Sequence, residues 1–216
     1  VYGDTGAGKS SLILEAAQYM RQRNRFPHGI FCCSLEGIRS MKAVRARLGQ
    51  TLNIPARSAP DLHDLMSRFS SCLLILDRCE DAIRVRRTPF YWFLTQLLQQ
   101  STVKVIISSQ EPMEDPRFFA ERGIVSSEVA LGEMRPRDSA LLLLESCERD
   151  IHASELGLTE EDEANGISII DALAAHPLLS SIRGMPAAVR WAAALRQCHV
   201  PTWRGWARRG GRGDGR

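Results

Sequence analysis

The first ten residues contain the pattern G-x-x-x-x-G-K-[ST], which begins at Gly3 and ends at Ser10. This loop constrains the fold because it joins a strand to a helix. Its glycines let the backbone turn so that successive N–H groups face phosphate oxygens. Lys9 can reach the β- and γ-phosphates, and the Ser10 hydroxyl can join a Mg²⁺ shell. The residues expected to bind nucleotide here are Gly3, Asp4, Thr5, Gly6, Ala7, Gly8, Lys9, Ser10 and Ser11.

Strand-type runs alternate with helical segments after this loop. The apolar runs cover residues 30–35, 72–76 and 103–107, with a further short strand expected near 128–131. The three longer runs are nearly continuous rather than alternating, which is typical of parallel strands covered on both faces. Segments with helical spacing lie at residues 10–25, 40–52, 62–70 and 90–99. This order predicts an α/β fold, the three-layer αβα sandwich of a P-loop NTPase with a parallel sheet.

The strand signals stop near residue 135. Helical segments follow at residues 138–149, 162–173 and 187–197. We therefore expect a nucleotide-binding domain at residues 1–134 and a small helical subdomain at 135–200. Residues 201–216 are rich in Arg and Gly, a composition typical of a disordered tail. Because a P-loop normally follows a full buried strand and the sequence opens at Val1, we expect the first strand to be truncated.

The charge and the apolar content of the chain argue against nucleic acid and membranes as partners. The chain of 216 residues has a net charge of +3, but residues 204–216 carry +4, so that the remainder sums to −1. Without a basic field on the folded part, we do not expect nucleic acid as a partner. No apolar run approaches the roughly 20 residues that span a bilayer, so we expect no membrane contact. The six cysteines form no C-x-x-C pair, which favours reduced thiols and a cytoplasmic location.

A second motif is an apolar strand that ends in an acid. Residues 73–77 read Leu-Leu-Ile-Leu-Asp, the form of a Walker B motif. An Asp at the carboxyl end of such a strand faces the crevice where ligands bind in open α/β sheets. The candidate strand 30–35 comes between the two motifs, which fits P-loop proteins in which a third strand separates the strands that carry them. We expect Ser10 and Asp77 to hold Mg²⁺ and Asp77 to act in catalysis.

The ordered combination of motifs resembles the NB-ARC domain of the STAND class of P-loop NTPases. The resemblance covers about residues 1–198. After the loop and the Asp77 strand comes Val103–Gln110, which looks like the sensor-1 strand. Next come Val129–Ala140, similar to the linker that opens the helical ARC subdomain, and Gly184–Val189, similar to the G-x-P motif of that subdomain. The family's winged-helix part has no counterpart in this sequence.

The resemblance implies a molecular switch that is closed with ADP and open with ATP. Self-association or binding of signalling proteins would follow in the ATP state, and Pro186 would pack against the nucleotide. Two positions depart from the family: Arg78 replaces the acid that usually follows Asp77, and Gln110 replaces the usual sensor Arg. Glu80 follows two positions after Arg78, and a side chain there points elsewhere. We therefore expect ATP or ADP and Mg²⁺ as ligands, and at most slow hydrolysis, with only a doubtful catalytic role for Glu80.

Other functions stay open at this point. The absence of [NT]-K-x-D and D-x-x-G patterns favours adenine over guanine. The main alternative is an AAA+-type ATPase that remodels protein or nucleic acid, although it would need a catalytic acid where Arg78 stands. A P-loop small-molecule kinase would need a lid and an acceptor site that we do not find in the sequence. A degenerate scaffold that binds no nucleotide is the remaining alternative.

Overall fold

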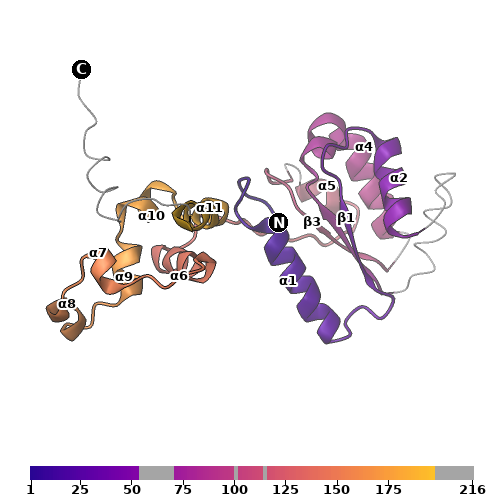
Figure 1. Ribbon diagram of the computed structural model, residues 1–216. Helices are drawn as coiled ribbons and strands as arrows, with labels where there is room; N and C mark the ends of the chain where they lie inside the picture. Colours follow the sequence, from indigo (N-terminus) through magenta and orange to yellow (C-terminus); the bar gives the residue numbers. More distant parts are fainter. Residues whose placement is uncertain (54–70, 100–101, 114–115, 198–216) are drawn as a thin grey trace, which may run out of the picture. The chain divides into compact units, whose positions relative to one another are not determined.

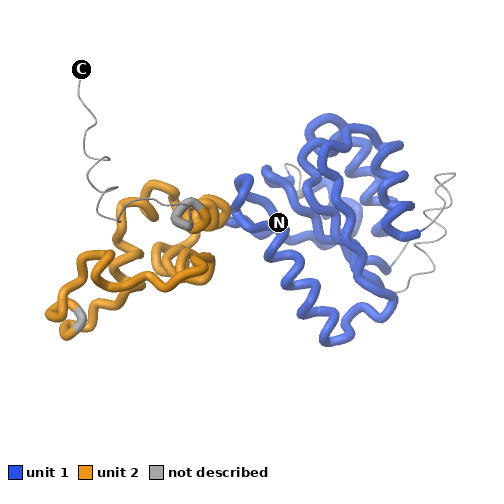
Figure 2. Tube along the Cα trace, in the orientation of Figure 1, with its two compact units in different colours: residues 1–131 blue, residues 132–216 orange. Residues whose placement is uncertain are grey.

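The computed structural model describes residues 1–53, 71–99, 102–113 and 116–197. The chain divides into two compact units, Val1–Leu131 and a second one that begins at Gly132 (Figure 2). The helix expected at residues 62–70 and the tail expected at 201–216 lie outside the described residues.

The first unit is built on a parallel sheet of strands β1, β2 and β3, in that spatial order. Each strand lies within one residue of the run expected for it. Strand β2 shows the reason most clearly, because its first four residues are buried and form a continuous apolar stretch. The register pairs Ser34, the last residue of β1, with Asp77, the last residue of β2. The strands cover Ile30–Ser34, Leu73–Asp77 and Lys104–Ile107.

The segment that leads into the loop extends this sheet beside β3. Tyr2 forms parallel bridges with Ser109, just after β3, and with Ala130. The fourth strand expected at residues 128–131 is therefore a bridge rather than a full strand. The strand that separates the loop from the Asp77 strand in space is β3, whereas the candidate 30–35 forms the far edge of the sheet. The prediction that residues 30–35 form the intervening strand was therefore wrong. It relied on the order of the strands along the chain, and neighbouring strands in a parallel sheet need not follow one another in sequence.

Helices cover both faces of the sheet (Figure 1). Alternate residues of β2 define the faces: Leu73 and Ile75 pack in a cluster with α1, whereas Leu74 and Leu76 pack in a larger cluster with α2 and α4. The result is the expected three-layer αβα arrangement. These helices cover Lys9–Gln22, Met41–Thr51 and Glu80–Gln99.

Helix α4 is bent, which explains why only its second half was expected from the sequence. Arg86 has a non-helical backbone, with φ −140° and ψ 47°, and Pro89 lies inside the helix. Proline cannot donate the helical hydrogen bond and restricts the residues before it. The expected segment 90–99 is the part after this bend. A short helix, α5 at Pro116–Ala120, was not expected.

An apolar cavity of about 750 Å³ lies beside β3 in the first unit. Its lining includes Leu12 and Ile13 of α1 and Leu94 and Leu98 of α4. Since α1 and α4 lie on opposite faces of the sheet, the cavity reaches both faces along the edge of β3. It extends to Val1 and to residues 123–129.

The second unit is helical throughout its described elements. The expected helix at residues 162–173 is wrong, because two short helices replace it. Gly166, with φ 81°, lies between them, and Ser168 begins the next helix with a capping box to Asp171. The helices are α6 (Pro136–Ser146), α7 (Ala153–Leu156), α8 (Glu160–Ala164), α9 (Ile169–Ala174), α10 (Pro177–Ser181) and α11 (Pro186–Gln197).

Helices α6, α9 and α11 form the centre of this unit. Leu143, Leu173 and Val189, one from each helix, are completely buried and belong to one apolar cluster. Among the described helices of the whole chain, none is both long enough and apolar enough to cross a bilayer.

Candidate nucleotide-binding site

Two glycines of the loop have roles that a side chain would disturb. Gly8 is the N-cap of α1 and has φ 92°, a left-handed conformation that favours glycine. Gly3 has φ 150°, and a Cβ built on it would come within 2.4 Å of the Leu131 carbonyl oxygen. Gly3 therefore lets the loop lie directly against the backbone that follows the Ala130 bridge.

The N-terminus of α1 is open toward the loop. Within the described residues no side chain caps this helix, and its first turn contains no acidic residue. The first N–H groups of a helix lack partners inside the helix, and the helix dipole makes this end positive. A loop that leads into the uncapped N-terminus of a helix can bind an anion such as a phosphate group.

Lys9 is folded across the loop rather than extended into solvent. Its side chain is buried, and its Nζ donates hydrogen bonds to the carbonyl oxygens of Gly3 at 2.7 Å and Asp4 at 2.9 Å. The ammonium group is thereby held over the backbone turn. A phosphate in the loop would meet this positive charge at short range.

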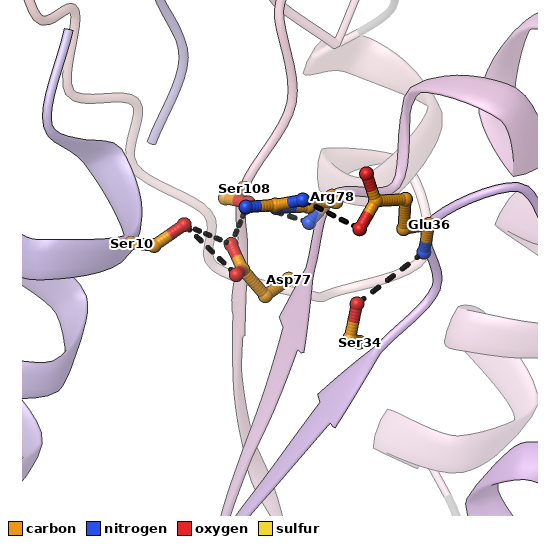
Figure 3. Close-up of polar contacts among 6 residues, drawn as sticks. All are labelled: Ser10, Ser34, Glu36, Asp77, Arg78 and Ser108. Carbon is orange, nitrogen blue, oxygen red and sulfur yellow. Dashed lines mark hydrogen bonds and ion pairs between the residues drawn. The ribbon is translucent and has the colours of Figure 1, made fainter. Parts of the chain in front are cut away.

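Ser10 and Asp77 are in direct contact. The Ser10 Oγ lies 3.0 and 2.8 Å from the two carboxylate oxygens of Asp77, to which it donates (Figure 3). The buried Ser108, just after β3, donates to the same carboxylate. A hydroxyl and a carboxylate are oxygen ligands of the kind that Mg²⁺ prefers. The two residues expected to hold the metal therefore lie together, and the chemistry of their oxygens fits it.

The residue at the expected sensor position also contacts the loop. The Gln110 amide nitrogen donates to the Thr5 hydroxyl at 2.9 Å. The backbone N–H of Ser109 donates to the Val1 carbonyl oxygen at 3.1 Å. The residues after β3 therefore contact both the loop and the segment that leads into it. A glutamine at the sensor position brings no positive charge.

The side chains that follow β2 have unexpected partners. Arg78 has φ 58°, and its backbone N–H donates to the Ser108 hydroxyl at 2.8 Å. Its guanidinium group forms an ion pair with Glu36, which lies two residues after the end of β1 (Figure 3). Glu36 was not expected at the site, because its pairing with Arg78 depends on the sheet register that sets Ser34 beside Asp77.

The acids after Arg78 lie on the first turn of α4. Glu80 begins this helix, and in the described part of the chain no hydrogen bond joins it to Ser10 or Asp77. Asp81 forms an ion pair with Arg39 at 3.2 Å. Neither acid is therefore held beside the Asp77 carboxylate in this structure.

In the second unit, the residues of the G-x-P motif contact the linker that precedes α6. The Met134 N–H donates to the Gly184 carbonyl oxygen at 2.9 Å. Gly184 has φ 59°, and a Cβ on it would come within 2.3 Å of the Met134 carbonyl oxygen. Pro186 is the first residue of α11. Its contact with a nucleotide stays a prediction.

Comparison with solved structures identifies the fold. The structure is similar to Drosophila ORC bound to DNA, with a TM-score of 0.60 and 13% identity, over 95% of this chain and 58% of that one. It is also similar to a Walker-type ATPase of Pyrococcus abyssi, with a TM-score of 0.52 and 14% identity, over 95% of this chain and 64% of that one. The chain thus spans less than two thirds of the length of each. The sequence matches no protein-family model and no curated protein.

At this level of identity the likeness concerns the fold. The likeness extends over 95% of this chain, which has a glycine loop at the start of α1 and a parallel sheet whose second strand ends in Asp77. The chain has the α/β fold of a P-loop NTPase.

Proposed function

We propose that this chain binds ADP and ATP with Mg²⁺ and serves as a nucleotide-dependent switch that hydrolyses ATP slowly. The observation that carries the proposal is the contact of Ser10 with Asp77 at the mouth of a glycine loop. The loop backbone and Lys9 would bind the phosphates, with Thr5 and Ser11 at its exposed rim. Ser10 and Asp77 would hold the metal, which neutralises phosphate charge when it is bound.

Slow hydrolysis follows from the residue after Asp77. An acid there would orient the attacking water, whereas Arg78 is cationic and is paired with Glu36. Asp77 has two hydroxyl partners, Ser10 and Ser108, and would act mainly through the metal. Glu80 is the first residue of α4, three positions beyond Asp77, and so does not occupy the position of the acid that would orient the water.

The switch itself needs a part that responds to the nucleotide. The linker and the G-x-P motif are the natural candidates, because Met134 and Gly184 pack closely within the second unit. A change at the linker would then reach α11, which begins at Pro186. Self-association or binding of a signalling protein in the ATP state belongs to the same proposal.

Single-turnover ATP hydrolysis combined with nucleotide retention tests this function. The purified chain would be mixed with radiolabelled ATP and Mg²⁺, and bound nucleotide and released phosphate followed over time. A switch retains ADP and turns over far more slowly than about one per second, the lower end of typical enzyme rates. No binding of either nucleotide at millimolar concentration contradicts the proposal, and Lys9→Ala provides the negative control.

A second candidate is an ATPase that remodels protein or nucleic acid. The comparisons support it at least as well, since one similar structure is ORC bound to DNA. Measuring ATP hydrolysis with and without duplex DNA separates the two functions. Turnover that rises above about one per second when DNA is added favours the remodelling ATPase, whereas an unchanged slow rate favours the switch.

A further inference from the structure

We propose that Arg78 distinguishes ATP from ADP by contacting the γ-phosphate, and that Glu36 holds its guanidinium group when this phosphate is absent. The inference rests on the proposed nucleotide site and adds a residue that sets its specificity. Arg78 stands where an acid that orients the attacking water is expected. Its presence explains slow hydrolysis but leaves the role of the arginine itself open.

The backbone of Arg78 is fixed at the edge of the sheet where a ligand would bind. Arg78 directly follows Asp77 at the carboxyl end of β2. Its N–H donates to the Ser108 hydroxyl, which in turn donates to the Asp77 carboxylate (Figure 3). The left-handed backbone at φ 58° is uncommon for arginine and persists because these contacts hold it. The side chain therefore begins one residue from the proposed metal ligand.

The side chain of Arg78 is paired, but weakly held. The side chain of Arg78 is 51% exposed and the side chain of Glu36 is 66% exposed. Ion pairs exposed to this degree are screened by water and contribute little to stability. Phosphate is a stronger partner, because it carries more charge and accepts two parallel hydrogen bonds from the guanidinium fork. Arg78 can therefore exchange Glu36 for phosphate at low cost.

The charges around the loop give this exchange its specificity. The Lys9 ammonium is already held at the loop itself, by Gly3 and Asp4. Gln110, at the expected sensor position, is neutral and binds Thr5. A γ-phosphate adds negative charge that a single lysine neutralises only in part, on the side of the loop where Ser10 contacts Asp77. With ATP bound, Arg78 would supply a cation to this phosphate. With ADP bound, Arg78 would stay paired with Glu36.

Binding measurements with the whole chain test this assignment. Isothermal titration calorimetry in Mg²⁺ would give the affinities for ADP and for a non-hydrolysable ATP analogue. Asparagine is the substitution of choice at position 78, because it accepts a left-handed backbone more readily than most residues. We expect Arg78→Asn to weaken binding of the ATP analogue about tenfold or more, the size of one charge-assisted hydrogen bond, while ADP binding changes less than about twofold.

Two further variants sharpen the result. Glu36→Gln removes the competing carboxylate, so the ATP analogue should bind about two- to threefold more tightly with ADP binding unchanged. Arg84→Gln is the matched control, since Arg84 is also an exposed arginine in an ion pair, 3.9 Å from Glu111, and its loss changes the net charge equally. This control should leave both affinities unaltered.

The outcomes separate this inference from the function on which it rests. Equal weakening of ADP and the ATP analogue by Arg78→Asn, or no weakening of either, overturns the γ-phosphate assignment while nucleotide binding stands. If the unsubstituted chain binds neither nucleotide, the proposed function fails first. Circular dichroism would verify that each variant is folded before its affinities are compared.

Discussion

The Ser10 hydroxyl donates to the Asp77 carboxylate across 67 residues of sequence, with oxygen separations of 3.0 and 2.8 Å. This contact joins the first turn of α1 to the carboxyl end of β2. The loop segment and β2 both end at the same edge of the sheet because their strands are parallel, with β3 between them. The nucleotide site therefore depends on the parallel direction of these strands as well as on its two motifs.

Lys9→Ala should abolish nucleotide binding without unfolding the chain. The ammonium group binds the carbonyl oxygens of Gly3 and Asp4 and lies outside the apolar clusters. We expect the affinity for ADP to fall about a hundredfold or more, since a buried charged partner of phosphate is lost. Titration calorimetry measures the affinity, and circular dichroism the fold. Lys42→Ala, an exposed lysine of α2, is the control; wild-type affinity in Lys9→Ala would contradict the prediction.

Asp77→Asn should weaken ATP binding only when Mg²⁺ is present. The amide keeps the size of the side chain and can still accept from Ser10, but it loses the charge that favours the metal. We expect about a tenfold loss of ATP affinity in Mg²⁺ and little change in EDTA. Asp81→Asn, whose carboxylate is paired with Arg39, is the matched control. An equal loss in EDTA would mean that Asp77 supports the loop rather than the metal.

The sequence predicted the elements whose residues carry their own signal. The three strands were located within one residue because each is a nearly continuous apolar run, as in β2, where Leu73 and Leu74 are buried on opposite faces. The Ser10 and Asp77 contact was also foreseeable, since the carboxyl ends of parallel strands share one edge of the sheet. These predictions needed only local patterns and one rule of topology.

Features that depend on pairings between distant segments were missed. Glu36 reaches Arg78 because the register sets Ser34 beside Asp77, and the order of motifs along the chain contains no register. The close packing of Gly184 against Met134 is another such feature. The expected helix at residues 162–173 was wrong for a local reason, since one apolar period continued across Gly166 and hid the break.

Gly184→Ala should destabilise the second unit. A Cβ at this position would approach the Met134 carbonyl oxygen to 2.3 Å, and the backbone φ of 59° is itself unfavourable for alanine. We expect a loss of unfolding free energy above ~2 kcal/mol, measured by urea denaturation. Gly166→Ala is the matched control, because its φ is 81° and a Cβ there meets nothing within 4 Å. It should cost only the ~1–2 kcal/mol of the backbone conformation; equal losses would show that the Met134 contact is irrelevant.

Glu155→Gln should make the free energy of unfolding depend less on pH in the acid range. Arg149 donates two hydrogen bonds to Glu155, each at 2.8 Å, and this pairing lowers the pKa of Glu155 from 4.5 to about 2. Because the folded pKa is depressed, the stabilisation is present above pH 4.5 and is lost as the pH falls toward 2. The side chain of Arg149 is half exposed and solvent screens the pair, so we expect at most about 1 kcal/mol at neutral pH.

Urea denaturation at several pH values between 7 and about 2.5 checks this prediction. Glutamine is chosen because it can still accept the hydrogen bond from the His152 N–H, which keeps the cap of α7. Glu145→Gln, on the exposed side of α6, is the control for loss of one charge. The same pH dependence in Glu155→Gln and in the unsubstituted chain would contradict the assignment.

An engineered strand added before Val1 should stabilise the first unit. The Val1 nitrogen donates to the Ile107 carbonyl oxygen at 2.8 Å, and Tyr2 bridges both Ser109 and Ala130, so the backbone here already has strand pairing on two sides. Continued upstream, this strand would enter the apolar cavity along β3.

A five-residue extension of Val and Ile should therefore raise the thermal midpoint by several degrees, as ~1–2 kcal/mol of added apolar burial would in a domain of this size. An extension of Gly and Ser tests chain length alone. If both extensions give the same midpoint, the cavity does not accept a strand.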